Sequence, residues 1–391
     1  MAMPRFVVHE KQVQGAATHA LVIGVGSYPY LVGGNGPLTD DNEGLRQLTS
    51  PPVSARAFAD WLVTSFSNPD KPLASVALLI SEANNVVDGN TSTYLNPKTN
   101  VSHDLERAQI DTVAKAVDEW QTRADSRVDN MTIFYFCGHG IAQSSDAALL
   151  TEDFGKINNN ALDGAIDFRK FQLGMNRCAA SQQCYFVDAC RASSDILIEN
   201  RDYAGRPLVQ ILKNARRGIP NRLSPVFYAS LGGDLAYARP GQASVFTDAL
   251  LKSLNGAGSD DEEGDWRVST TRLLDALNYY MSREFDGGGT QVQVPTTGDQ
   301  AVMHIHYLTN PKVPVEVKCQ PDAATALAVL ACLQGGVEQH TRPPTNEKAW
   351  RVADGLPPGE YEFRATFANT YNNGKATQYV RPAYRVINIV V

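Results

Sequence analysis

Two residues with the chemistry of a nucleophile and a base each follow an apolar run that predicts a buried strand. Cys190 closes the strand in YFVDACRAS (185–193), and His139 stands between two glycines at the end of FYFCGHG (134–140). An imidazole beside a thiol supplies the base that makes a thiolate, which is the attacking species. Each residue alone has a commoner explanation, a core thiol or a turn histidine bonded to a carbonyl. Because both stand at strand ends, we predict that they act together in catalysis.

The segments that must position this pair alternate between apolar runs and amphipathic stretches. Apolar runs predict strands, and apolar residues at helical spacing predict helices. Strands are expected over 19–28, 74–80, 131–137, 183–189, 224–231 and 301–308, and helices over 53–66, 105–120, 167–178, 244–254 and 269–285. This alternation indicates an α/β fold with a mainly parallel sheet covered by helices on both faces. In such sheets chemistry gathers at the carboxyl ends of the strands, where His139 and Cys190 are expected.

The composition changes near residue 310, where short β-type runs separated by Pro-Gly turns replace the alternating pattern. We therefore predict two domains, the first over 1–309 and a small β-sandwich over 311–391. The alanine-rich segment 322–333 fits either a helix or a pair of strands. The sandwich contains no group of catalytic type, and modules of this kind usually bind or position a partner, for example by pairing at a sheet edge.

The composition of the 391-residue chain limits the classes of function. Apolar residues make up 43% and charged residues 20%, which allows a substantial core, and the net charge of −7 argues against an extensive nucleic-acid-binding surface. No run suits a signal peptide or a membrane span, so a cytoplasmic protein without a membrane partner is expected. None of the six cysteines forms a CxxC pair, so neither a zinc ribbon nor a disulfide scaffold is predicted.

The two strand-end motifs together resemble the caspase and metacaspase clan of cysteine proteases. In that clan a His-Gly closes one strand and an Asp-x-Cys or Gln-Ala-Cys closes the next, and the 51 residues from His139 to Cys190 fit the roughly 50 expected. The likeness spans about residues 18–308, and it includes ALVIGVGSY (20–28) and the stretch 227–254, in which SVFT begins a helix. The resemblance implies a mainly parallel six-stranded sheet with helices on both faces.

The resemblance also implies the roles of the motif residues. His139 is the general base, Cys190 is the nucleophile, and the backbone N–H groups of Gly140 and Cys190 form the oxyanion hole. The chain is then a cysteine endopeptidase acting on protein substrates, and the bacterial relatives imply a role in defence, such as antiviral defence, or in regulated cell death. Two alternatives stay open, a catalytically silent caspase-like scaffold that recruits partners and a cysteine hydrolase of small-molecule esters or amides.

Asp188 lies two residues before the nucleophile, where caspases carry glutamine and metacaspases carry an aspartate of the pocket for arginine or lysine. A carboxylate in a partly dry pocket favours a basic side chain, so we expect cleavage after arginine, less often after lysine. The alternative is that Asp188 caps the following helix. The second pocket aspartate of metacaspases is missing, because its position falls near Ser54. Asp40 and Asp41 are candidates to replace it, and Cys137 is either part of this pocket or a core thiol.

The segment after the nucleophile, about 191–224, is long and rich in arginine. The resemblance implies that a cut in this connection converts a zymogen to the active form, made by the enzyme itself or by an upstream activating protease. The alternative is a solvated surface loop. The candidate processing sites are Arg201, Arg206, Arg216, Arg217 and Arg222.

No cofactor or metal is expected. The turn GVGSYP has Pro29 where a dinucleotide-binding motif needs its third glycine. His304 and His306 share one face of a strand, but two ligands without a third make a poor zinc site. The acidic run 259–265 does not match a calcium-binding loop, although some metacaspases are activated by calcium, and a solvated linker is the preferred interpretation.

Overall fold

The computed structural model describes residues 6–82, 92–143, 146–190, 192–200, 203–211, 222–230, 240–261, 264–284, 295–298 and 301–391. The chain divides into two compact units, residues 1–251 with 280–303 and residues 252–279 with 304–391, and each is described by itself. The domain boundary at residues 309–311 that the sequence suggests stays a prediction.

A central sheet of seven strands in the order β1-β3-β2-β6-β10-β12-β15 forms the middle of the first unit. Its strands are β1 (Val7–Glu10), β2 (Thr18–Val25), β3 (Leu73–Ser81), β6 (Met131–Gly138), β10 (Gln182–Ala189), β12 (Val226–Tyr228) and β15 (Thr296–Gly298). The inner strands are parallel to one another, and β1 and β15 are antiparallel edge strands. The mainly parallel sheet is confirmed, with one strand more than the six expected.

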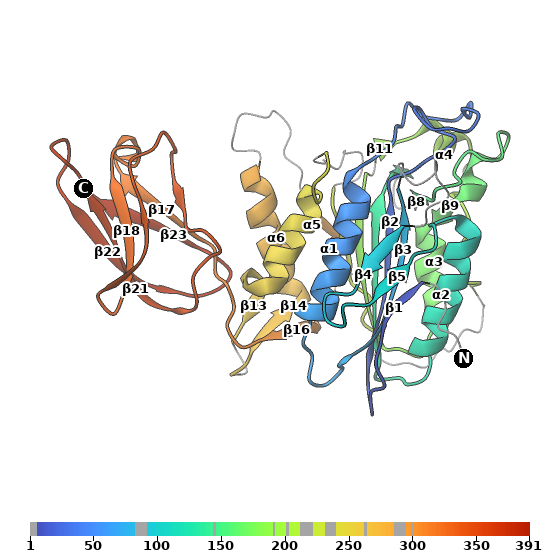
Figure 1. Ribbon diagram of the computed structural model, residues 1–391, viewed down its shortest axis with the longest axis horizontal. Helices are drawn as coiled ribbons and strands as arrows, with labels where there is room; N and C mark the ends of the chain where they lie inside the picture. Colours follow the sequence, from blue (N-terminus) through green and yellow to red (C-terminus); the bar gives the residue numbers. More distant parts are fainter. Residues whose placement is uncertain are drawn as a thin grey trace. The chain divides into compact units, whose positions relative to one another are not determined.

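Helices cover both faces of this sheet, α1 and α5 on one face and α2 and α3 on the other (Figure 1). Their bounds are α1 (Ser50–Thr64), α2 (Ile110–Ala124), α3 (Phe168–Gly174) and α5 (Val245–Lys252). Successive side chains of β6 point to opposite faces. The Tyr135 ring stacks on Phe58 of α1 with 4.6 Å between centroids, and Phe134 lies 5.1 Å from Phe171 of α3. Because both faces are covered, the inner strands are continuous apolar runs in the sequence.

After the carboxyl ends of β6 and β10, the chain enters a smaller sheet with the strand order β11-β7-β8-β9. Its strands are β7 (Gly140–Gln143), β8 (Asp146–Leu150), β9 (Ala165–Asp167) and β11 (Ala192–Ser193). Since β11 pairs with β7 in parallel, the segments after β6 and β10 stay side by side. The other elements of this unit are β4 (Thr93–Leu95), β5 (Ser102–Asp104), α4 (Asp195–Glu199) and short 3₁₀ turns at Ala161–Gly164 and Met175–Arg177.

A three-stranded sheet in the order β13-β14-β16 belongs to the second unit. Its strands are β13 (Ser259–Asp260), β14 (Trp266–Ser269) and β16 (His304–Leu308), and the nearby helical segments are Ser253–Ala257 and α6 (Thr270–Glu284). The prediction that the run 301–308 is the last strand of the central sheet is wrong, because β16 pairs with β14. The edge position is taken by β15, a polar Thr-Thr-Gly segment whose sequence resembles a turn.

Two further sheets of the second unit, β20-β17-β23 and β19-β18-β21-β22, enclose one apolar core. Their strands are β17 (Val315–Gln320), β18 (Val329–Gln334), β19 (Val337–Arg342), β20 (Trp350–Arg351), β21 (Gly359–Thr366), β22 (Gly374–Val380) and β23 (Arg385–Val390). The β-rich C-terminal part expected from the sequence is confirmed. The alanine-rich segment 322–333 forms a 3₁₀ turn at Asp322–Ala324 followed by β18. In the part of the chain that the structure describes, no helix is both long and apolar enough to span a membrane.

Candidate active site

His139 and Cys190 occupy equivalent positions on neighbouring strands. The last residue pair of β6 and β10 is Gly138 with Ala189, and β7 and β11 resume pairing with the same offset. His139 and Cys190 each follow directly after that last pair. Because adjacent strands lie about 4.8 Å apart, the two residues are neighbours where the chain passes from one sheet to the other. The backbone register thus brings the predicted base and the predicted nucleophile together.

The His139 side chain is buried and held by two groups from the loop that follows β2. Its Nε2 lies 2.6 Å from the backbone oxygen of Arg46, and its backbone N–H donates to the Tyr28 hydroxyl at 2.8 Å. A carbonyl oxygen only accepts, so Nε2 carries the proton and Nδ1 keeps the lone pair that a base needs. Burial lowers the pKa of His139 to about 4, against a smaller opposing effect of the Arg46 hydrogen bond. The imidazole is therefore neutral at pH 7 and able to accept a proton.

Cys190 is partly exposed, whereas the other five cysteines are buried. The backbone of Gly140 lies directly against it, since a Cβ at Gly140 would stand 2.6 Å from the Cys190 carbonyl oxygen and 2.9 Å from the Ala189 Cβ. Only glycine allows this approach, which explains the residue type after His139. The two backbones that would supply an oxyanion hole are therefore side by side, at a partly exposed cysteine.

Asp188 is the penultimate residue of β10 and is only 4% exposed. Its Oδ2 accepts hydrogen bonds from the Ser244 hydroxyl, from Thr247 Oγ1 at 2.6 Å and from Cys137 Sγ at 3.3 Å. Burial raises the pKa of this carboxyl group, and the hydrogen bonds oppose the increase. The alternative that Asp188 caps the following helix is wrong, because it lies inside a strand and Ser194 is the residue that precedes α4.

Ser54 of α1, near which the resemblance to metacaspases puts the missing second pocket aspartate, joins this cluster. It is fully buried, and its Oγ accepts a hydrogen bond from the Ser244 backbone N–H at 2.9 Å. A hydrogen bond with Ser54 also lowers the pKa of the Cys137 thiol, which burial raises well above its ordinary value. Groups from β6, β10, α1 and α5 thus form one buried polar cluster beside Cys190, and Ser54 makes it less acidic than the metacaspase pattern.

The remaining pocket candidates differ in where the structure places them. Cys137 is opposite Asp188 in the β6–β10 pairing, so it lies within the cluster. Asp40 is exposed and pairs with Asn158, which donates to its carboxylate at 2.8 Å. Asp41 is half-buried in the same loop. The structure joins Cys137 to Asp188 and gives Asp40 a different partner.

Several residues of the site were not identified from the sequence. Arg46 acts through a backbone carbonyl, which leaves no trace in a side-chain pattern. Tyr28 and Tyr135 stand in apolar runs where an aromatic residue is expected for packing alone. Ser244 and Thr247 carry a signal in the sequence, because the SVFT helix start is part of the resemblance, but the sequence alone assigns no role to their hydroxyls.

The model of the family described as Caspase domain matches residues 17–301, which includes every residue of the two strand-end motifs. The chain belongs to the caspase-domain family. It is 26% identical over 310 residues to the uncharacterized protein y4kE of Sinorhizobium fredii, and the match covers 73% of this chain and 85% of that protein. Caspase-1 from Spodoptera frugiperda matches with a TM-score of 0.43 and 13% identity, over 73% of this chain and 86% of that one. Members of this family are cysteine peptidases.

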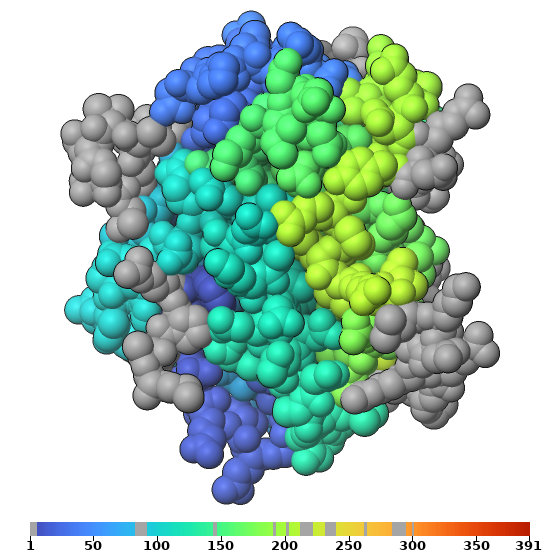
Figure 2. Space-filling view, turned by 90° about the vertical axis from the view of Figure 1, so that its right-hand side faces the viewer, coloured from blue at the N-terminus to red at the C-terminus, as the bar shows by residue number. Residues whose placement is uncertain are grey.

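Two of the processing candidates in this caspase domain are held by the fold. Segment 203–211 runs beside α2 (Figure 2), and Arg206 pairs with Asp111 of that helix at 2.7 Å. The backbone of Arg206 also bonds to Ala165 and Asp167. Arg222 donates to the carbonyl oxygens of Cys178 and Ala180 at 2.7 and 2.8 Å. The other candidates, Arg201, Arg216 and Arg217, lie outside the described residues.

The histidines and the acidic run that were weighed as metal sites fall in the second unit. His306 is buried in β16 and His304 is half-buried on the same strand. In the acidic run, Asp260 pairs with Arg272 at 3.7 Å and Asp265 with Arg267 at 3.6 Å, while residues 262–263 lie outside the described part. Asp260 and Asp265 thus face arginine side chains, and Asp261 is exposed, which fits the interpretation as a solvated segment.

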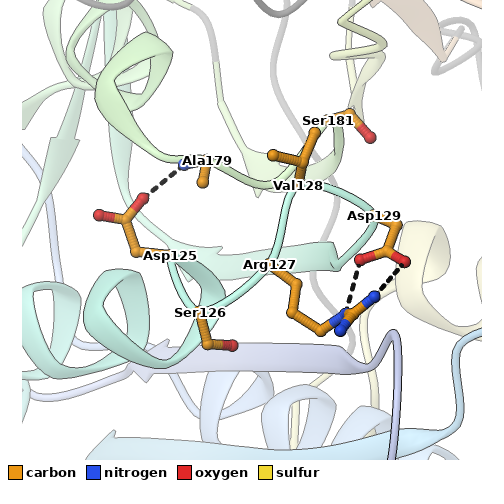
Figure 3. A pocket seen from close by; sticks show the side chains of 7 residues that line it. All are labelled: Asp125, Ser126, Arg127, Val128, Asp129, Ala179 and Ser181. Atoms are coloured by element: carbon orange, nitrogen blue, oxygen red, sulfur yellow. Dashed lines mark hydrogen bonds and ion pairs between the residues drawn. The ribbon is translucent and has the colours of Figure 1, made fainter.

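A hollow of about 600 Å³ lies at the opposite end of the strands of the caspase-domain sheet, near the amino ends of β6 and β10. As Figure 3 shows, Arg127 turns to Asp129 with a 2.8 Å ion pair, and Asp125 accepts a hydrogen bond from the Ala179 backbone. The three charged side chains that line it thus have partners within the lining, and they lie at the opposite strand ends from Cys190. This hollow is therefore separate from the candidate active site.

Proposed function

We propose that the chain is a cysteine endopeptidase that uses Cys190 and His139 and cleaves proteins after arginine, less often after lysine. The observation that carries the proposal is the buried carboxylate of Asp188 two residues before the accessible thiol. Among the residues that the structure describes, the groups bonded to this carboxylate are a thiol and hydroxyls, all of them neutral. A buried anion without a cationic partner is costly, and a basic substrate side chain supplies that partner.

The catalytic steps follow from the arrangement of the two residues. Nδ1 of His139 takes the proton of the Cys190 thiol, and the thiolate attacks the scissile carbonyl carbon. The backbone N–H groups of Gly140 and Cys190 stabilise the resulting oxyanion. When the C–N bond breaks, the imidazolium gives its proton to the departing amine and an acyl-enzyme remains. Water, deprotonated by the imidazole, then releases the acid and restores the thiol.

Fluorogenic peptides that end in arginine, lysine, citrulline or aspartate test this specificity, before and after limited proteolysis of the protein. We expect turnover in the order arginine, lysine, citrulline, and the Asp188→Asn variant should lose about a hundredfold in kcat/KM for arginine because the charge pairing is gone. Asp40→Asn, which removes an exposed carboxylate paired with Asn158, is the matched control and should keep the preference. Faster cleavage after aspartate, or an unchanged arginine preference in Asp188→Asn, would overturn the proposal.

We also propose that a cut within residues 191–224 controls this activity and that the protease acts in bacterial defence or cell death. The family resemblance supports both statements. Bacteria that carry the intact gene or the Cys190→Ala variant can be compared for survival of the culture under phage challenge. Equal survival of the two strains would count against the defence role while leaving the peptidase proposal intact.

A further inference from the structure

Three side chains donate hydrogen bonds to the same one of the two carboxylate oxygens of Asp188. Ser244, Thr247 and Cys137 each donate to Oδ2. Two of these donors stand at the start of α5, where Ser244 Oγ also accepts from the Thr247 backbone N–H at 3.0 Å and so caps the helix. The clamp on Oδ2 is therefore built into a helix end and does not depend on a loose surface side chain.

The proton count in this cluster suits an ionised carboxylate. A hydroxyl group has one proton to donate. With Asp188 ionised, Thr247 can give its proton to Asp188 and accept one from the Tyr135 hydroxyl, which lies 2.6 Å from Thr247 Oγ1. Ser244 likewise donates to Asp188 and accepts from a backbone N–H. Protonating Asp188 would leave these donors with a poorer acceptor, so the cluster favours the anion.

We propose that Ser244 and Thr247 are specificity-determining positioning residues, which keep Asp188 ionised and turn its Oδ1 toward the basic side chain of the substrate. This proposal rests on the proposed function, because it concerns the same pocket. It adds that discrimination for a positive charge depends on two hydroxyls that themselves carry no charge. Neither hydroxyl needs to touch the substrate, since each acts through the carboxylate.

The groups that face Asp188 determine how its charge responds to pH. Among the described residues they are Cys137 and Tyr135 from β6, Ser54 from α1 through Cys137 and Ser244, and Ser244 and Thr247 from the start of α5. Burial raises the pKa of Asp188, and the hydroxyl donors oppose that increase. Removing a donor therefore raises this pKa further, and the carboxyl group takes up its proton at a higher pH. As the pH is lowered, a variant that lacks a donor should therefore stop preferring a charged substrate at a higher pH than the wild type does.

The Thr247→Val variant tests the proposal, because valine keeps the shape of threonine and removes only the hydroxyl. The quantity to measure is the ratio of kcat/KM for an arginine peptide to that for its citrulline analogue, from pH 5 to pH 8. Titration of His139 and Cys190 affects both substrates and cancels in the ratio. We expect the ratio at neutral pH to fall about tenfold. We also expect the decline of the ratio at acidic pH to begin at a higher pH than in the wild type. Thr247→Ser restores a hydroxyl and should restore both.

The possible outcomes separate this proposal from the proposed function. A wild-type ratio near one would refute arginine specificity itself, and this proposal with it. The wild-type ratio could instead be high and remain unchanged in Thr247→Val, with the same decline at acidic pH. That result would refute only the role of the hydroxyl. Melting temperatures show whether each variant is folded. If Thr247→Val does not fold, Ser244→Ala and its Ser244→Thr rescue carry the same comparison, with the helix cap restored in the rescue.

Discussion

The hydroxyl of Tyr28 accepts a hydrogen bond from the backbone N–H of His139, and the two rings lie 4.8 Å apart at an angle of 47°. The same hydroxyl donates to the backbone oxygen of Leu150 at 3.3 Å. Tyr28 follows β2, and His139 follows β6, so this contact ties the loop after one strand to the end of its neighbour. Since a Cβ at Gly138 would stand 2.8 Å from the Tyr28 oxygen, the glycine before His139 makes room for it.

We expect Tyr28→Phe to lower kcat about tenfold and to leave KM nearly unchanged. The variant keeps the ring but removes the hydroxyl, so the buried backbone N–H of His139 loses its hydrogen-bond acceptor. This loss costs about 1–3 kcal/mol, and we expect it to displace the imidazole. Steady-state kinetics with an arginine peptide separates kcat from KM. A rise in KM at constant kcat would show instead that Tyr28 shapes the substrate pocket.

The Cys190→Ala variant should lose peptide cleavage by at least about a thousandfold, because the acyl-enzyme can no longer form. Cys184→Ala is the matched control, since Cys184 is on the same strand but fully enclosed, and burial raises the pKa of its thiol. The control should retain cleavage. If Cys190→Ala turned over peptides like the wild type, the nucleophile would be elsewhere. If the wild type cleaved no peptide and both proteins bound the same partners, the scaffold alternative would be preferred.

The central part of the fold and the proximity of His139 to Cys190 could be predicted from the sequence for one physical reason. The spacing from His139 to Cys190 equals the offset of the β6–β10 pairing, in which Met131 lies beside Gln182. When the spacing of two residues equals the register offset of two paired strands, the pairing itself places the residues side by side. The glycine after His139 is informative in the same way, because the approach of the Cys190 backbone excludes any side chain there.

Other parts of the fold and of the site could not be predicted, because the sequence does not indicate which strand or side chain each residue contacts. β16 has the apolar pattern of a central strand, yet it pairs with β14, while the weakly patterned β15 takes the sheet edge. The Arg46 carbonyl that fixes the His139 tautomer would serve equally well on any residue type. Thr247 reaches Asp188 only because α5 begins near the carboxyl end of β10, a relation of tertiary structure alone.

Processing of the intact protein should not occur after Arg206 or Arg222. The backbone of Arg206 is paired with β9, and the next residue is Pro207, so the bond that follows cannot enter a protease cleft as an ordinary extended segment. Arg222 is bound to carbonyl oxygens of the segment before β10. Mass spectrometry of the processed protein gives the new termini. Fragments that begin at Pro207 or Leu223 would contradict this prediction.

Trypsin provides the control for this protection. The bond after Arg222 should resist the protease in the native protein and become sensitive in urea, when the hydrogen bonds of its guanidinium group are lost. The bond before Pro207 should stay intact in both conditions. Rapid cutting after Arg222 in native buffer would show that the contacts with Cys178 and Ala180 do not restrict this segment.

The stability of the first unit should fall as the pH drops from about 6.5 to about 4. His19 and His139 are both buried, and burial lowers the pKa of each to about 4. In this range the unfolded chain binds protons that the folded chain does not, so stability decreases with falling pH. For one such histidine the loss between pH 7 and pH 5 is about 2 kcal/mol. Urea unfolding followed by tryptophan fluorescence at the two pH values measures it.

His19→Asn isolates the effect of one histidine without altering the catalytic pair. His19 Nδ1 lies 2.8 Å from the Ser75 hydroxyl, and an asparagine amide can keep a hydrogen bond at that place. Asparagine does not titrate, so the variant should lose about 2 kcal/mol less than the wild type between pH 7 and pH 5. Nearby Arg123 adds to the depression of the His19 pKa, so Arg123→Gln should reduce the pH dependence by a smaller amount. An identical pH dependence in wild type and His19→Asn would mean that His19 is already protonated in the folded protein at pH 5.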